Sequence, residues 1–275
     1  MKKINPINNS KKVFDCITFF RENLITNLRF EILNDVVDYF IVCESLYDHR
    51  GNKKKINFKI INKKFEKKII HIVIKKNFNT TNPWKAQAIQ REYIFEGIKN
   101  AHDNDYIMFS DPDEIPNPDI LKKIVLKKKY GIFMQSSFCY KFNLFNKYET
   151  PWQGTRICKK KNLRSIDYMR QKILLKNLKY SFWRIDKNKD IQIINNGGWH
   201  FNNIFSPKEI SIKLKTFAHT EFSNPKFSSI KIIKKKIDKK IDLFNRGWFF
   251  TKINIDKTFP KKIVNKINKF PDLIL

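Results

Sequence analysis

The chain is short of cysteine and of long apolar segments. Its four cysteines, Cys16, Cys43, Cys139 and Cys158, lie far apart without C-x-x-C spacing, which excludes the pattern of a disulfide framework or a zinc site and favours reduced core thiols. No segment reaches the run of about 18 apolar residues that a membrane-spanning helix needs, and no signal-type apolar segment follows the basic N-terminus. We therefore expect an intracellular protein without a signal peptide or a transmembrane anchor.

Acidic residues are also scarce, with 26 Asp and Glu against 56 Lys and Arg, and the formal net charge is +30. Such a charge is typical of proteins that bind nucleic acids or anionic membranes. The chain is also rich in Asn, Ile and Phe, which share A/T-rich codons with Lys, and its lysines are scattered in short runs such as 53–55, 127–129 and 234–236. No helix-turn-helix, zinc or RNA-recognition signature accompanies them. We expect no nucleic-acid partner, and keep a basic nucleic-acid-binding protein as an alternative.

Strand-like and helical patterns alternate through the first half of the chain. Helices are expected at Glu22–Asn34 and from Asn82-Pro83 to about Ala101, and strands at Val13–Phe19, Tyr39–Cys43, Ile69–Ile74 and Tyr106–Phe109. With 275 residues, 41% of them hydrophobic, the chain is long enough to bury a substantial core. The alternation predicts an α/β, Rossmann-like fold with a mainly parallel central sheet flanked by helices.

The second half is less regular. Gly131–Phe145 favours one or two strands, Pro151–Thr155 a loop, and Ile191–Ile194 a strand. Two helices are then expected, one from the capping box Ser206-Pro207-Lys208-Glu209 to about Ala218, and a lysine-rich one from about Phe227 to Arg246, stopped by Gly247. Since no repeat or linker appears, we expect one domain over residues 1–275, with a flexible tail at 1–11 and a helical C-terminal extension at 223–275.

The most informative segment is Tyr106–Pro116, in which an apolar run ends in three carboxylates, those of Asp111, Asp113 and Glu114. In open α/β sheets the ligand crevice lies beyond the carboxyl ends of the strands. Pro112 restricts Asp111 to extended backbone, so the two aspartates tend to emerge on the same side, as a divalent cation with phosphate oxygens requires. This is the D-x-D arrangement of nucleotide-sugar transferases. The alternative is a solvated acidic turn ahead of a capped helix.

Several motifs in order resemble glycosyltransferase family 17, the family of bisecting-type N-acetylglucosaminyltransferases that act on the β-linked mannose of N-glycans. They are Val13–Phe20, Asn34–Ser45, Ser110–Pro116 and Gly198–Phe201, and the similarity covers about Lys12 to Pro271. The resemblance implies a GT-A fold, a UDP-sugar donor that is UDP-N-acetylglucosamine in known members, a divalent cation, inversion at the anomeric carbon, and a glycan or glycoprotein acceptor. The animal enzymes carry a membrane anchor, and its absence here fits a cytoplasmic enzyme of a bacterium or of a virus-infected cell. The oligomeric state stays open.

The resemblance also suggests which residues bind the metal. Asp113 is expected as a direct ligand, with Asp111 contacting a metal-bound water or the ribose. A histidine late in the chain often completes such sites, which indicates His200, with His219 as a rival and a hydrogen-bonded structural histidine as the alternative. Oxygen ligands with one imidazole suit Mn²⁺ well and Mg²⁺ acceptably.

Five further residues are expected near the donor. Glu44 and Ser45 end a strand at the same sheet edge as Asp111 and by resemblance meet uracil or ribose, although a helix cap or turn would also explain them. Arg91 suits a phosphate or ribose contact, against the alternative of a solvated helix face. Trp152 and Gly154 resemble the family's W-x-G loop, in which the glycine lets the backbone approach the sugar and the aromatic ring stacks on it, while a core position for Trp152 is equally open.

Direct displacement by an acceptor hydroxyl needs a carboxylate base on the face opposite the departing UDP. Glu114 and Glu221 are the candidates that the sequence leaves unseparated, with Asp167 as a weaker third. A metal-dependent phosphoesterase is the other enzyme class with an Asp-x-Asp cluster at a strand end. Such sites recruit further ligands, and with five histidines in the chain no second cluster is evident.

Overall fold

The computed structural model describes residues 11–179, 190–216 and 219–275. The tail predicted at 1–11 therefore lies outside the described residues except for Lys11, as does the end of the helix predicted to reach Ala218. Within the described ranges, no helix combines the length and the apolar content needed to cross a membrane. The expected cytoplasmic location stays a prediction.

The first half of the chain forms the parallel part of the sheet. Strands β1 (Val13–Phe19), β2 (Tyr39–Ser45), β3 (Ile69–Ile74) and β4 (Tyr106–Ser110) all run parallel, in the order β3-β2-β1-β4. They alternate with α1 (Asn23–Leu33), α2 (Pro83–Glu92) and two 3-10 helices, η1 (Lys63–Lys68) and η2 (Tyr93–Ile98). The predicted alternation is confirmed, although the helix expected to reach Ala101 continues beyond Glu92 as the 3-10 helix η2.

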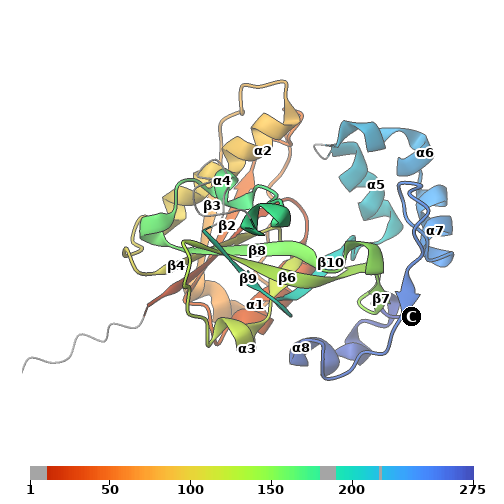
Figure 1. Ribbon diagram of the computed structural model, residues 1–275. Coiled ribbons are helices and arrows are strands. Elements are labelled where there is room, and N and C mark those ends of the chain that lie inside the picture. The colour runs from red at the N-terminus through yellow and green to blue at the C-terminus, as the bar shows by residue number, and fades with distance from the viewer. Residues whose placement is uncertain (1–10, 180–189, 217–218) are drawn as a thin grey trace, which may run out of the picture.

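Side chains along these strands alternate between two apolar cores, one on each face of the sheet. In β4, Tyr106 and Met108 face the core shared with α1, whereas Ile107 and Phe109 face the core shared with α2, η2 and α4 (Ile166–Arg170). Because both faces of the sheet are covered, successive residues of β4 are all buried, which explains the near-continuous apolar run in its sequence. Figure 1 shows α2 and α4 on one side of the sheet and α1 and α3 (Pro118–Leu121) on the other.

The second half extends this sheet with antiparallel pairs. Strand β8 (Trp152–Lys159) lies between β4 and β6 (Tyr130–Cys139) and is antiparallel to both, while β6 pairs in parallel with β9 (Ile191–Ile194) and β10 (Gly198–Asn202). Short strands β5 (Glu114–Pro116), β7 (Leu144–Phe145) and β11 (Thr251–Lys252) pair at its margins. The α/β, GT-A-type fold is confirmed as a mixed sheet whose parallel strands are concentrated in the first half. The loop predicted at Pro151–Thr155 was wrong, because β8 begins at Trp152.

The C-terminal third is helical in part. The predicted capping box begins α5 (Pro207–Thr216), with Glu209 N donating to Ser206 Oγ and Ser206 N donating to Glu209 Oε2. Helices α6 (Pro225–Ser228), α7 (Ile230–Asp238) and α8 (Lys261–Val264) follow, with short 3-10 helices elsewhere in the chain at η3 (Lys147–Glu149), η4 (Lys160–Asn162), η5 (Leu175–Lys179), η6 (Thr220–Ser223), η7 (Ile267–Lys269) and η8 (Pro271–Leu273). In Figure 1, α5, α6 and α7 gather beside the end of the sheet that carries β7 and β10.

The lysine-rich helix predicted to reach Arg246 was wrong, since it ends at Asp238. Lys240 has a positive φ of 56°, which no α-helix accommodates, and the chain then turns back so that Ile241 bridges Phe249. The buried carboxylate of Asp242 closes this turn by accepting from the backbone N–H groups of Phe244 and Arg246. In this segment, hydrogen bonds from the backbone to the Asp242 side chain take the place of the backbone hydrogen bonds of the predicted helix.

Candidate active site

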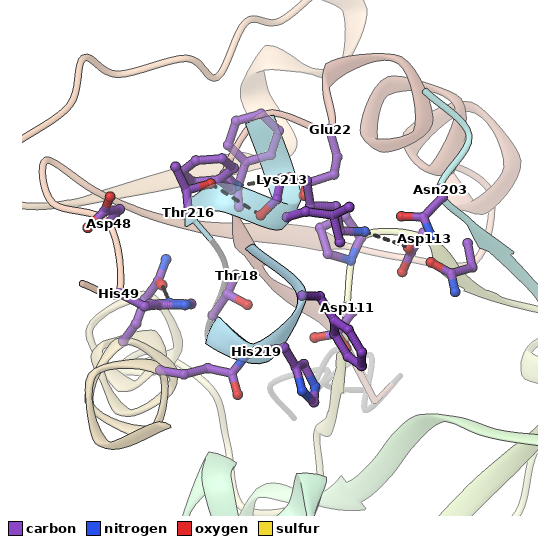
Figure 2. A pocket seen from close by; sticks show the side chains of 18 of the residues that line it. Thr18, Glu22, Asp48, His49, Asp111, Asp113, Asn203, Lys213, Thr216 and His219 are labelled. Carbon is purple, nitrogen blue, oxygen red and sulfur yellow. Dashed lines mark hydrogen bonds and ion pairs between the residues drawn. The ribbon is translucent and has the colours of Figure 1, made fainter. Parts of the chain in front are cut away.

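A cavity of about 620 Å³ lies beyond the carboxyl ends of β1, β2 and β4. This is the switch point of the sheet, because β2 and β4 lie on opposite sides of β1. Residues at and after the three strand ends line one wall, and α5, η6, Phe244 and Arg246 contribute to the opposite wall. Figure 2 shows Asp48 and His49 on one side of the cavity and Asp113 and Asn203 on the other. Its volume is within the range of small-molecule sites.

The loop after β4 is held from within the protein by Arg29. This arginine is fully buried and forms a two-pronged ion pair with Asp15, at 2.7 Å from Nε and 2.6 Å from Nη2. Its Nη1 donates to the backbone oxygen of Glu114 at 2.6 Å, and its Nη2 to Ser110 Oγ at 2.6 Å. Sequence reasoning missed this network, for which the available signal was a carboxylate inside an otherwise apolar strand.

Arg170, at the end of α4, holds the same loop by contacting two of the loop's side chains. Its Nη2 lies 2.9 Å from Asp111 Oδ2 and 2.7 Å from Glu114 Oε1. Burial alone would lower the pKa of Arg170, but the carboxylates of Glu114 and Asp111 raise it above its ordinary value. Burial alone would raise the pKa of Asp111. The positive charges of Arg170 and Arg91 outweigh burial, and the pKa of Asp111 falls well below its usual range. Asp111 is therefore ionised at any physiological pH.

Glu114, a candidate base, does not line the cavity. Its side chain is fully buried, and its carboxylate accepts hydrogen bonds from Trp152 Nε1 at 2.7 Å, from Arg170 at 2.7 Å and from the backbone N–H of Asp111 at 3.3 Å. A carboxylate removed from water needs such donors. These three hydrogen bonds hold the carboxylate within the loop, away from the cavity.

Asp113 and His200 do meet in the cavity. Asp113 Oδ1 lies 3.9 Å from His200 Nε2, and Asp113 Oδ2 lies 4.0 Å from Lys213 Nζ. Burial raises the pKa of Asp113. The His200 ring stacks on Trp152 at 4.7 Å, and its buried Nδ1 has no hydrogen-bond partner among the described residues.

The Asp113–His200 pair fits a divalent cation as two of its ligands. An ion about 2.1 Å from each donor atom fits between atoms 3.9 Å apart, and Mg²⁺-like ions take their remaining ligands from water and substrate phosphates. In the part of the chain that the structure describes, no group of three or more His, Cys, Asp or Glu side chains comes together as a metal site. An ion held here would therefore take its remaining ligands from water or from a bound ligand.

Arg91 lines the cavity from α2, near His49. Its Nη1 lies 2.7 Å from Asp167 Oδ1, so Asp167, the third candidate base, is paired and does not itself line the cavity. His49 Nε2 lies 2.8 Å from Gln90 Oε1, and burial lowers the pKa of this histidine. A neutral imidazole and a guanidinium thus share the wall beyond β2 and α2.

Glu44 and Ser45 are buried behind the cavity wall and do not line it. Glu44 accepts from Lys54 Nζ at 2.9 Å and from the backbone N–H of Asn57 at 2.7 Å, while Ser45 Oγ accepts from the N–H of Tyr47 at 3.0 Å. Both side chains are engaged by the protein itself, and the expected direct contact with uracil or ribose stays a prediction. Their side chains hold Lys54 and Tyr47, which do line the cavity.

Trp152 lines the cavity at the start of β8, but Gly154 does not. A Cβ atom added at Gly154 would overlap the side-chain amide of Gln135. The space beside this glycine is filled by the fully buried Gln135, and the expected approach of its backbone to a sugar stays a prediction. The glycine is explained by packing between β6 and β8.

Glu221 lies at the cavity on η6 and, unlike Glu114, is exposed. A backbone hydrogen bond and the side chain of His219, 2.8 Å away, lower its pKa. The ring of His219 meets the edge of Trp84 from α2 at 4.5 Å between centroids. Among the described residues, His219 belongs to no group of three or more His, Cys, Asp or Glu side chains that could hold a metal ion.

A family model described as glycosyltransferase family 17 matches residues 2–248 of the chain. The chain is also 26% identical over 130 residues to the beta-1,4-mannosyl-glycoprotein 4-beta-N-acetylglucosaminyltransferases of Rattus norvegicus and Homo sapiens. Each match covers 43% of this chain and 24% of the relative, so the chain spans about a quarter of the length of these relatives. Among solved structures, glucosyl-3-phosphoglycerate synthase from Mycobacterium tuberculosis is 11% identical with a TM-score of 0.35, covering 93% of this chain and 92% of that one. That structural similarity is too low to support an argument.

Proposed function

The chain belongs to glycosyltransferase family 17, and from that premise we propose that it transfers N-acetylglucosamine from UDP-N-acetylglucosamine to a hydroxyl group of a glycan, with inversion and with a divalent cation. The observation that carries the proposal is the Asp113–His200 pair in a cavity at the switch point of the sheet. The names of the curated relatives support the sugar and a β-linked mannose as acceptor. The match covers about a quarter of the length of these relatives, so we propose both the donor and the acceptor for this chain.

The donor is proposed to lie across the ends of β1, β2 and β4, with its diphosphate toward Asp113 and His200. Mn²⁺ or Mg²⁺, held by these two side chains, would neutralise the charge that develops on the leaving diphosphate. Arg170 keeps Asp111 ionised and oriented beside the site, ready to accept from a ribose hydroxyl or a water. Arg91 places a guanidinium on the same wall, where it suits a phosphate or ribose oxygen.

Glu221 is the proposed general base. A base must reach the proton that it takes, and of the three candidates Glu221 alone is an exposed carboxylate at the cavity. Its lowered pKa keeps it ionised, and therefore able to accept a proton, at neutral pH. Glu114 is committed to the loop after β4, and Asp167 to Arg91.

The acceptor is proposed to enter along the wall opposite the strand ends. Phe222 and Phe244 have ring centroids 4.0 Å apart there, and Glu149 lies 3.2 Å from Arg246 Nη1. All four line the cavity. Aromatic faces beside charged hydrogen-bonding groups suit a sugar ring with its hydroxyls, which supports a glycan or glycoprotein as partner.

The test is UDP release from UDP-N-acetylglucosamine in the presence of Mn²⁺ and candidate glycans, with p-nitrophenyl phosphate as the control substrate. We expect UDP release without phosphate-ester hydrolysis, abolished by Asp113→Ala with an unchanged melting temperature. His200→Ala should raise the Mn²⁺ concentration that gives half of full activity. Wild-type activity in Asp113→Ala would overturn the metal assignment, and hydrolysis of p-nitrophenyl phosphate would favour a phosphoesterase.

A further inference from the structure

Lys213 brings a third charged group to Asp113, from the opposite wall of the cavity. It lies on α5, and its Nζ is 4.0 Å from Asp113 Oδ2, while His200 lies on the side of Oδ1. Its side chain is 21% exposed and lines the cavity, and Figure 2 shows it reaching in from the helix. No sequence motif marked this lysine among the many others.

The ammonium group of Lys213 keeps its hydrogen-bond donors available. A hydrogen bond from N–H to oxygen needs about 2.7–3.2 Å between the heavy atoms, so a separation of 4.0 Å is an ion pair without one. Within the described part of the chain, the ammonium makes no hydrogen bond, and it lies over the ring of Phe205 at 5.5 Å from the ring centroid. A partly buried ammonium with three unused donors is suited to an anionic oxygen of a ligand.

The carboxylate of Asp113 alone does not account for this placement. A lysine that served only to neutralise it would gain most by closing the remaining distance to a direct hydrogen bond. A negatively charged ligand bound beside Asp113 would instead lie within reach of both Lys213 and His200, and it would give the ammonium a partner for its donors. The diphosphate of the proposed donor is such a ligand.

We propose that Lys213 is a catalytic residue that contacts the β-phosphate of the donor, an inference that rests on the proposed function. In the transfer, the bond from the anomeric carbon to the β-phosphate oxygen breaks, and its electron pair stays on the departing UDP. The acceptor oxygen bonds to the anomeric carbon, and its proton passes to Glu221. Lys213 transfers no proton in this step and stabilises the charge that grows on the β-phosphate.

Binding of UDP and UMP separates this contact from a general effect of charge. UDP has the β-phosphate and UMP lacks it, so calorimetry in Mn²⁺ should give Lys213→Met a roughly tenfold to hundredfold loss of affinity for UDP and no loss for UMP. Lys213→Arg should retain most of the UDP affinity. The matched control is Lys215→Met, an exposed lysine on the same helix, which should bind both nucleotides as the wild type does.

Each other outcome has a definite meaning. Equal UDP affinity in Lys213→Met and wild type overturns the inference. An equal loss of affinity for UDP and UMP in Lys213→Met overturns it as well. Both results leave the proposed function standing. A wild-type protein that binds no UDP overturns the proposed function, and the inference with it. Melting temperatures identify a variant that fails to fold. In that case Lys213→Gln, which keeps a flexible polar side chain without the charge, replaces Lys213→Met and is judged by the same two nucleotides.

Discussion

Replacing Arg170 by methionine should destabilise the protein substantially. The guanidinium is the shared partner of Asp111 and Glu114, and Glu114 is fully buried. Removing one partner of a buried ion pair costs about 3–5 kcal/mol, because the remaining charge is left uncompensated. The side chain of Asp111 is 37% exposed and recovers water, so most of the loss comes from Glu114. We expect the free energy of unfolding to fall by about 3 kcal/mol, the lower end of that range.

The measurement is urea unfolding followed by circular dichroism, for Arg170→Met, Glu114→Gln and the double variant. Because Glu114→Gln removes the charge that Arg170 compensates, the double variant should lose less stability than the sum of the two single losses, by on the order of 1–3 kcal/mol. Arg164→Met is the matched control, since Arg164 precedes the same helix and is exposed. A loss below about 1 kcal/mol in Arg170→Met, or strict additivity in the double variant, would refute the reasoning.

Three further changes test other parts of the structure. Gly154→Ala should lower the free energy of unfolding by about 1–3 kcal/mol because it displaces Gln135, and Gln135→Ala in the same chain should restore part of the loss in urea unfolding. For Glu44, burial alone would raise the pKa of the carboxyl, but hydrogen bonds outweigh burial and lower the pKa overall. Glu44→Gln should therefore destabilise the protein at pH 7. The difference in melting temperature from the wild type should shrink at acidic pH, where the folded wild type takes up a proton at Glu44. Arg91→Ala should weaken UDP binding roughly tenfold to hundredfold by calorimetry, whereas neutralising the run 234–236 should leave it unchanged; equal losses would mean that the general positive field holds the nucleotide.

The sequence determined the secondary structure where a local signal was strong. The strands Val13–Phe19 and Ile69–Ile74 have the predicted bounds, and the capping box at Ser206 begins its helix. It also placed Asp111 and Asp113 at a sheet edge and paired Asp113 with a late histidine. Alternation, capping and a strand end followed by carboxylates are properties of a few neighbouring residues, which is why the sequence alone reveals them.

The tertiary structure alone decided how each polar side chain near the cavity is used. Glu44, Glu114 and Gly154 looked like ligand contacts, but burial gave them protein partners. Arg170 and Lys213 carried no motif and reached the aspartates from elements distant in sequence, Arg170 across 59 residues to Asp111. Whether a carboxylate faces ligand or protein depends on which donors the packing brings within about 3 Å, and that is a property of the assembled fold rather than of local sequence.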